Sequence, residues 1–198
     1  MLSGHLKVGY VGWPLSIWGR QGGWPPRILF LDHRHAAAHC CGMTSRFAPY
    51  RALAPYDWAS ILRLIQAEFA YMDGVVDPPS SMHGLTPTAI ARQAETGEVW
   101  VIGTPAIACV FLTPQVDALY IGKLAVAADH RGQGFARALL DKAADRAREL
   151  HLSALTLQTR VELVENHAAF AALGFVETGR AAHSGFHFPT TVNFRKSV

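Results

Sequence analysis

A glycine-rich turn, Arg131 to Ala136, contains the residues of this chain best suited to chemistry. It lies between an apolar run, Leu119 to Val126, and a helix-like run, Phe135 to Leu150. A turn that opens a helix gathers unpaired backbone N–H groups at the positive end of the helix dipole. Glycine lets a phosphate approach that backbone closely. The turn therefore predicts a phosphate site, with an ordinary strand–turn–helix connection as the other interpretation.

The elements that would position this turn alternate along the chain from about residue 47. Strands are expected at Phe47 to Leu53, Glu98 to Ile102, Ala106 to Leu112, Ala118 to Val126, Leu155 to Arg160, Phe175 to Arg180 and Thr191 to Lys196. Helices are expected at Pro55 to Tyr71, Thr86 to Thr96, Phe135 to Leu150 and Asn166 to Leu173. The order β-α-α-β-β-β-α-β-α-β-β predicts an α/β (α+β) layer architecture with a mixed sheet.

Two common phosphate-binding motifs do not fit the turn. A P-loop requires Lys followed by Ser or Thr after its last glycine, whereas Phe135 and Ala136 follow here. A dinucleotide fold places its glycines after the first strand of a parallel βαβ unit. This turn follows the fourth expected strand, after a run of hairpins, so that fold is disfavoured.

Composition limits the class of protein. The 198 residues suit one domain, and half of them are hydrophobic. Residues 1–45 hold four basic and one acidic side chain, and the remainder holds 14 of each, so nucleic acid is not an expected partner. No run reaches the roughly 18 apolar residues of a membrane span, and no signal peptide is recognisable. Three cysteines make no disulfide framework, which favours a cytoplasmic protein without membrane association.

Residues 1–42 are expected to be a poorly ordered extension, rich in Trp, Pro and Gly, with Met43 as the functional start and the domain at 43–198. A cluster from His33 to Cys41, with His35, His39 and Cys40, resembles a zinc-ligand set in composition. Its spacing matches none of the usual zinc patterns, so no metal site is expected.

The chain resembles the GNAT-type, acyl-CoA-dependent N-acetyltransferases. The resemblance lies in Arg131-x-x-Gly134-x-Ala136, in the preceding Leu124-Ala125-Val126, and in Glu165 to Phe170 closing with Leu173-Gly174-Phe175. It covers roughly Phe47 to Lys196 and implies a GNAT-like mixed, mostly antiparallel sheet flanked by about four helices. The family frequently dimerises, so a homodimer is a further implication.

The resemblance implies that acetyl-CoA is the co-substrate, without a metal. Its pyrophosphate would lie on the turn, and its amide-bearing pantetheine arm would pair with a strand edge. Asn166 would contact the cofactor, with helix N-cap as its other role. The implied cofactor-binding residues are Leu124, Ala125, Val126, Arg131, Gly132, Gln133, Gly134, Phe135, Ala136, Asn166 and Phe170.

The implied reaction is direct acyl transfer to an amine in a ternary complex, with an N–H near Val126 polarising the thioester. Many relatives have a Tyr acid where this chain has Phe170, which has no proton to give. Tyr120 is the substitute considered for the acid, and Glu162, then Glu98, for the base. Tyr120 also suits an ordinary packing role, and Glu162 and Glu98 also suit the role of surface carboxylates.

The acceptor side is expected at Tyr71 to Leu85, which contains Asp73 and Asp77, with Ala182 to Pro189 as one wall. The acceptor is a small-molecule or peptide amine of unidentified structure. The alternative function is a non-catalytic acyl-CoA-binding or regulatory module of the same fold.

Overall fold

The computed structural model describes residues 47–198. The expected extension over residues 1–42, the start at Met43 and the cluster from His33 to Cys41 lie outside these described residues.

Strands and helices follow one another along the described residues in the predicted order. The strands are β1 (Tyr50–Arg51), β2 (Glu98–Ile102), β3 (Ala108–Pro114), β4 (Ala118–Val126), β5 (Ala154–Arg160), β6 (Val176–Ala181) and β7 (Thr191–Ser197). The α-helices are α1 (Trp58–Phe69), α2 (Pro87–Thr96), α3 (Phe135–Glu149) and α4 (Val164–Ala172). Short 3-10 helices are η3 (Ala70–Met72), η4 (Ser81–Gly84) and η5 (Ala128–His130). The order inferred from sequence is confirmed.

One seven-stranded sheet, in the order β1-β2-β3-β4-β5-β7-β6, forms the centre of the described domain. Every pair of neighbouring strands is antiparallel except β4 and β5, which are parallel. The predicted mixed, mostly antiparallel sheet is therefore confirmed.

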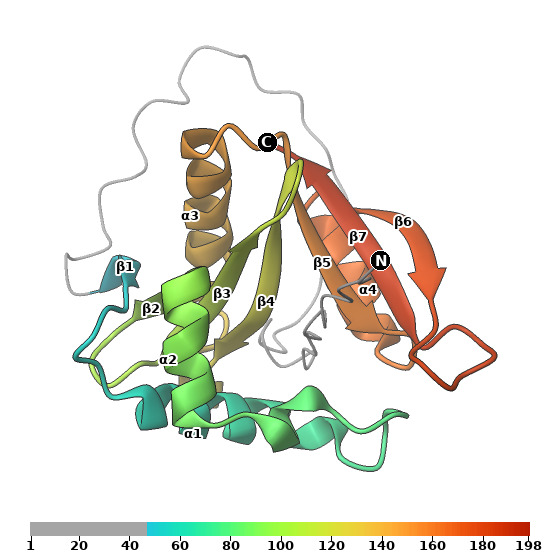
Figure 1. Cartoon of the computed structure of the whole chain (residues 1–198), viewed down its shortest axis with the longest axis horizontal. Coiled ribbons are helices and arrows are strands. Elements are labelled where there is room, and N and C mark those ends of the chain that lie inside the picture. Colours follow the sequence, from blue (N-terminus) through green and yellow to red (C-terminus); the bar gives the residue numbers. More distant parts are fainter. Residues whose placement is uncertain (1–46) are drawn as a thin grey trace, which may run out of the picture.

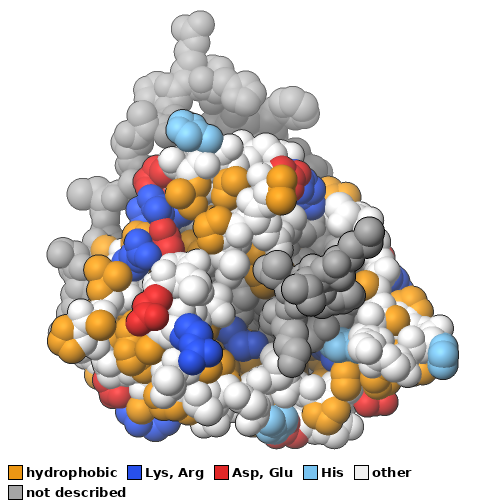
Figure 2. Space-filling view, in the orientation of Figure 1, with side chains coloured by type: hydrophobic (Ala, Val, Ile, Leu, Met, Phe, Trp, Pro, Cys, Tyr) orange, Lys and Arg blue, Asp and Glu red, His pale blue; other side chains and the backbone are white. Residues whose placement is uncertain are grey.

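Successive side chains of a strand point to opposite faces of the sheet. Both faces are apolar here, and helices cover each of them. On one face, α1 and α2 pack through Ile61, Ile65 and Ile90. On the other, α3 and α4 pack through residues such as Leu139 and Phe170. Figure 1 shows α3 and α4 behind the two halves of the sheet, whose strands diverge between β4 and β5. Lys, Arg, Asp and Glu are interspersed on the face shown in Figure 2.

The β4–β5 ladder is incomplete. β4 pairs with β5 only from Ala118 to Ile121, so Gly122 to Val126 have no partner on β5. On its other side, β4 has a β-bulge, where Lys123 and Leu124 oppose the single residue Val110 of β3. Bulges bend a strand and re-aim its side chains, and they are frequent next to active sites. The second half of β4 thus presents an edge that no described strand covers.

Some expected boundaries were wrong. The first strand, expected from Phe47, has only two residues in β1. The helix expected to reach Tyr71 ends at Phe69 and continues as the 3-10 turn η3. Helix α4 begins earlier than expected and has Leu163 as its N-cap, so Asn166 does not cap it.

Within residues 47–198, no helix combines the length and apolar character needed to cross a bilayer. In the same range, no three side chains among His, Cys, Asp and Glu are grouped so as to hold a metal ion.

Candidate active site

The glycine-rich turn joins η5 to α3 at the end of β4. Gly132 and Gly134 have φ of 74° and 84°, in the left-handed region that favours glycine. Gly134 is the N-cap of α3 and supplies no side chain, so the first N–H groups of the helix have no cap. A Cβ built on Gly134 would meet no atom within 4 Å, which shows open space beside the turn. The turn therefore has the donors and the room that a phosphate requires.

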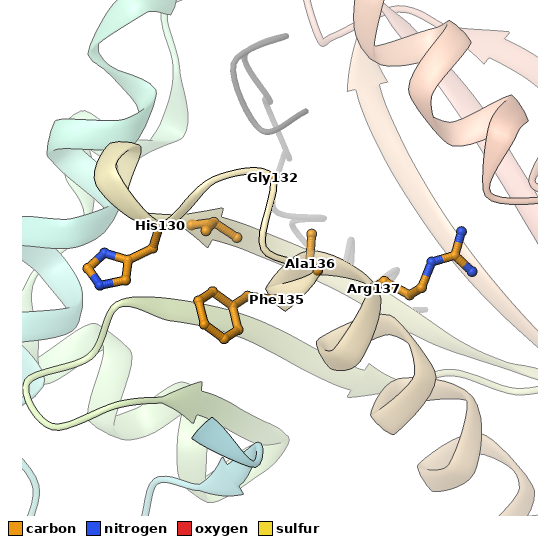
Figure 3. A pocket seen from close by; sticks show the side chains of 7 residues that line it. His130, Gly132, Phe135, Ala136 and Arg137 are labelled. Atoms are coloured by element: carbon orange, nitrogen blue, oxygen red, sulfur yellow. The ribbon is translucent and has the colours of Figure 1, made fainter. Parts of the chain in front are cut away.

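A small pocket of about 110 Å³ lies against this turn, and Figure 3 shows it from close by. It is lined by Val126, His130, Gly132, Gly134, Phe135, Ala136 and Arg137. His130 and Phe135 lie on one side of it, whereas the Arg137 guanidinium extends on the other. Its volume is well below that of a pocket enclosing a drug-sized ligand, so it suits one part of a larger cofactor.

Arg137 is a candidate phosphate-binding residue that the sequence reasoning missed. Its position in the first turn of α3 opposes the helix dipole, which favours acidic side chains there. A basic residue at an unfavourable position beside a glycine turn is the signal that could have found it. His130, also missed, has a buried Nδ1 without a hydrogen-bond partner in the described part of the chain.

Arg131 is held by the protein itself. Its guanidinium forms an ion pair with Glu68 of α1, and its Nε donates to the Val126 carbonyl at 3.4 Å. The Glu68 carboxylate also accepts from the Ala128 N–H at 3.0 Å. Both charged side chains are largely buried, with 14% and 10% exposed. This network fixes the glycine-rich turn to α1, a role that spacing along the sequence does not reveal.

The backbone of Val126 faces the open edge of β4. Ala127 donates its N–H to Ile107 on the β3 side at 2.8 Å. Since successive residues of an antiparallel ladder alternate in direction, the Val126 N–H points away from β3, toward the edge that β5 leaves uncovered. An extended, amide-bearing ligand can pair with such an edge.

The buried side chain of Asn166 and the buried hydroxyl of Tyr71 form a polar pair nearby. Asn166 is 2% exposed, and apart from their approach to each other neither its Nδ2 nor the Tyr71 hydroxyl has a hydrogen-bond partner among the described residues. Burial raises the pKa of Tyr71, an effect that the adjacent Asn166 and Arg131 partly offset. Buried polar atoms without partners are uncommon in proteins and indicate a place where a ligand or water completes the bonding.

Phe170 has a packing role in the core. It is fully buried, with its ring centroid 5.9 Å from Phe175 and 5.7 Å from Phe194. Such aromatic contacts stabilise the core beyond the area that they bury. The side chain has no proton for a leaving group, as its type already implied.

The structure does not bring the two predicted catalytic residues together. Tyr120 pairs with Thr156 near the start of β5, whereas Glu162 lies just beyond the end of that strand. Glu162 accepts from the Asp77 N–H at 3.1 Å and lies 3.5 Å from the Arg160 guanidinium. It therefore contacts the predicted acceptor loop, whereas Tyr120 lies in the closed part of the β4–β5 ladder.

Glu98 is engaged by other side chains. Burial alone would raise its pKa, but hydrogen bonds from Arg146 and Trp100 outweigh that effect and lower it. A carboxylate with a lowered pKa and two strong donors is a poor proton acceptor at neutral pH. Glu98 therefore serves the packing of α3 on β2.

The model of the Acetyltransferase (GNAT) family matches residues 58–175, more than half of the chain. Among solved structures, the chain is similar to a GNAT-family acetyltransferase from Staphylococcus aureus Mu50 at 14% identity, covering 76% of this chain and 98% of that one, with a TM-score of 0.61. A GNAT-family acetyltransferase from Elizabethkingia anophelis with acetyl-CoA bound is 16% identical, covering 78% and 100%, with a TM-score of 0.54. The ribosomal-protein-S18-alanine N-acetyltransferase from Escherichia coli is 17% identical, covering 75% and 93%, also at 0.54.

The chain belongs to the GNAT acetyltransferase family, a class of enzymes that transfer an acyl group from acyl-CoA to an amine. The resemblance inferred from the glycine turn, the preceding strand and the later helix is thereby confirmed, as is the GNAT-like fold.

Proposed function

We propose that the protein transfers an acetyl group, or a related acyl group, from acetyl-CoA to the amine of an acceptor by direct transfer in a ternary complex. The observation that carries this proposal is the continuity of two features. The uncovered edge of β4 ends at Val126, and that residue also lines the pocket of the glycine turn. A ligand with a pyrophosphate followed by an extended amide arm matches both features at once.

Each part of this surface has a separate role in holding the cofactor. The backbone N–H groups from Gly132 to Ala136 receive the pyrophosphate, and Arg137 adds a positive charge beside them. Leu124 to Val126 pair with the pantetheine amides. Arg131 acts through the turn that it braces, because its guanidinium is already paired with Glu68. Asn166 supplies a buried Nδ2 donor whose hydrogen bonding the described residues other than Tyr71 leave incomplete.

The acyl transfer requires a polarised thioester, a neutral amine and a stabilised leaving thiolate. The uncovered edge of β4 near Val126 presents backbone N–H groups that point away from β3, and one of them is suited to polarise the thioester carbonyl. Glu162 is the candidate base, because it contacts the loop on the acceptor side. Tyr120 is less suited to donate a proton, because β5 pairs with the segment of β4 that contains it.

The acceptor amine is proposed to bind at the loop between η3 and η4. An open hollow of about 540 Å³ lies there, lined by residues from Met72 to His83. Asp73 and Asp77 line it and can attract a cationic amine, although Asp73 already contacts His83 at 2.8 Å.

Phe170 supports the second candidate, a non-catalytic acyl-CoA-binding module, since it replaces a proton donor with a fully buried core residue. A thiol-release assay with acetyl-CoA separates the two functions. It is run over small amines, amino acids, polyamines, aminoglycosides and peptide N-termini. Release that depends on one acceptor class supports the transferase, whereas acetyl-CoA binding without release on any acceptor favours the module.

We also propose that the catalytic domain spans residues 43–198 and acts in the cytoplasm, which the low cysteine count favours. A chain that begins at Met43 should then be soluble and retain full activity. An insoluble or inactive product would contradict this boundary.

A further inference from the structure

Lys123 occupies an unusual place in the sheet. It belongs to the β4 bulge, is only 7% exposed, and has a φ of 48°, a conformation uncommon for a residue other than glycine. The buried Cys109 thiol donates to its carbonyl at 3.5 Å. Backbone strain of this kind persists where the surroundings enforce it, and it is frequent at functional sites.

The Lys123 side chain extends toward the acceptor side of the site. Its Nζ donates to the Ser81 hydroxyl at 2.8 Å. Ser81 begins η4, in the loop proposed to bind the acceptor amine. Lys123 therefore joins the strand that would hold the cofactor to the loop that would hold the acceptor.

The path of the cofactor leads to this residue. From the glycine turn, an arm paired with β4 passes Val126 first and Leu124 next, at about 3.3 Å per residue. The following residue along that path is Lys123, in the bulge and one residue from Gly122, where the uncovered edge begins. The thioester end of the arm thus arrives beside the Lys123 side chain.

The surroundings of Lys123 favour the transfer of a proton. Burial lowers the pKa of its ammonium to about 8, an effect opposed weakly by Cys109. Burial also raises the pKa of Cys109 to about 12, so the thiol is neutral. Cys109 faces Lys123 from β3, and Ser81, which does not titrate at these pH values, faces it from η4. Near neutral pH the side chain is thus mainly protonated and close to its midpoint.

We propose that Lys123 is the general acid that protonates the leaving thiolate of coenzyme A, a role that the Phe170 side chain cannot fill. The amine nitrogen forms the C–N bond to the acyl carbon, the C–S bond breaks, and sulfur takes a proton from the Lys123 ammonium. The proton lost by the amine passes to base or solvent, and the neutral lysine regains a proton from water. This inference rests on the proposed acyl-CoA function.

Proton transfer from the Lys123 ammonium to the thiolate is nearly balanced in free energy. An unperturbed thiol of cysteine has a pKa of about 8.5, close to that of the buried ammonium, and matched values favour proton transfer. Arginine at the same position would keep the positive charge but could not release a proton at these pH values. Lys123→Arg and Lys123→Met therefore separate charge stabilisation from proton donation.

The first experiment measures the thiol pKa of bound CoA from thiolate ultraviolet absorbance, with the desulfo-CoA complex as blank. The proposal predicts that the wild-type protein lowers the thiol pKa by about one unit or more relative to free CoA. Lys123→Arg should keep that shift, and Lys123→Met should abolish it. An unshifted thiol in the wild-type complex overturns the proposal without any variant, and CoA that does not bind overturns the proposed function as well.

The second experiment measures turnover with an acceptor found in the thiol-release assay. Both variants should lose at least about 100-fold in kcat with the KM for acetyl-CoA little changed, since general acid catalysis contributes 10²–10⁴-fold. The wild-type kcat should also fall as pH rises through about 8. Undiminished kcat in Lys123→Met overturns the role of Lys123 and leaves the proposed function intact. An acetyl adduct on Lys123, detected by intact mass, would also overturn it, because it indicates a nucleophile.

Discussion

The ion pair between Glu68 and Arg131 is expected to hold the phosphate turn against α1. Glu68→Gln keeps the shape of the side chain and its acceptor for the Ala128 N–H, but removes the charge. Leaving a buried charge without its partner costs about 3–5 kcal/mol. Because 14% of Arg131 and 10% of Glu68 remain exposed, solvent reduces this cost, and we expect about 3 kcal/mol of lost stability.

Urea unfolding measures this loss as a lower midpoint at an unchanged slope. Adding Arg131→Gln to Glu68→Gln removes both charges and should recover most of the loss. The matched control is Arg63→Gln on the same helix, which breaks an exposed pair with Asp57 and should cost about 0.5 kcal/mol or less. A Glu68→Gln cost close to that of the control would refute the role of this pair as a buried brace.

Four further outcomes follow from the site. Arg137→Gln should weaken acetyl-CoA binding by about tenfold in calorimetry, whereas Arg148→Gln at the other end of α3 should not. Phe170→Ala should cost about 3–5 kcal/mol of stability and weaken acetyl-CoA binding through lost packing, and an unchanged affinity would count against the second part. Glu162→Gln should flatten the acidic limb of the pH–rate profile, and an untouched profile would remove it as the base. The stability difference between the wild type and Lys123→Met should change by about 3 kcal/mol in favour of the wild type from pH 8 to 10.5, because in this window the unfolded chain binds the proton that folded Lys123 has lost, whereas the buried Cys109 thiol affects both proteins alike.

The sequence was sufficient to predict the order of elements and the glycine-rich turn between β4 and α3 because both depend on local patterns. Apolar residues repeat at strand or helix spacing, and Thr86 with Pro87 begins α2 as expected, with the Thr86 hydroxyl accepting from the Ala89 N–H. Gly132 and Gly134 adopt the left-handed conformations that glycine makes accessible.

Contacts between distant segments could not be predicted in this way. Arg131 and Glu68 are 63 residues apart, and no periodicity relates them. The β4 bulge depends on the register with β3, so no local pattern indicated that Lys123 would lie at the uncovered edge. Arg137 could have been found, because a basic residue in the first turn of a helix is unfavourable there without a ligand.

The proposed function requires that the uncovered edge of β4 and the glycine-rich turn together hold acetyl-CoA. Amide NMR of the ¹⁵N-labelled protein during titration with acetyl-CoA tests this claim most directly. The largest shifts are expected in Leu124 to Val126 and in Gly132 to Arg137. Binding that leaves both segments unperturbed, or the absence of any binding, would contradict it.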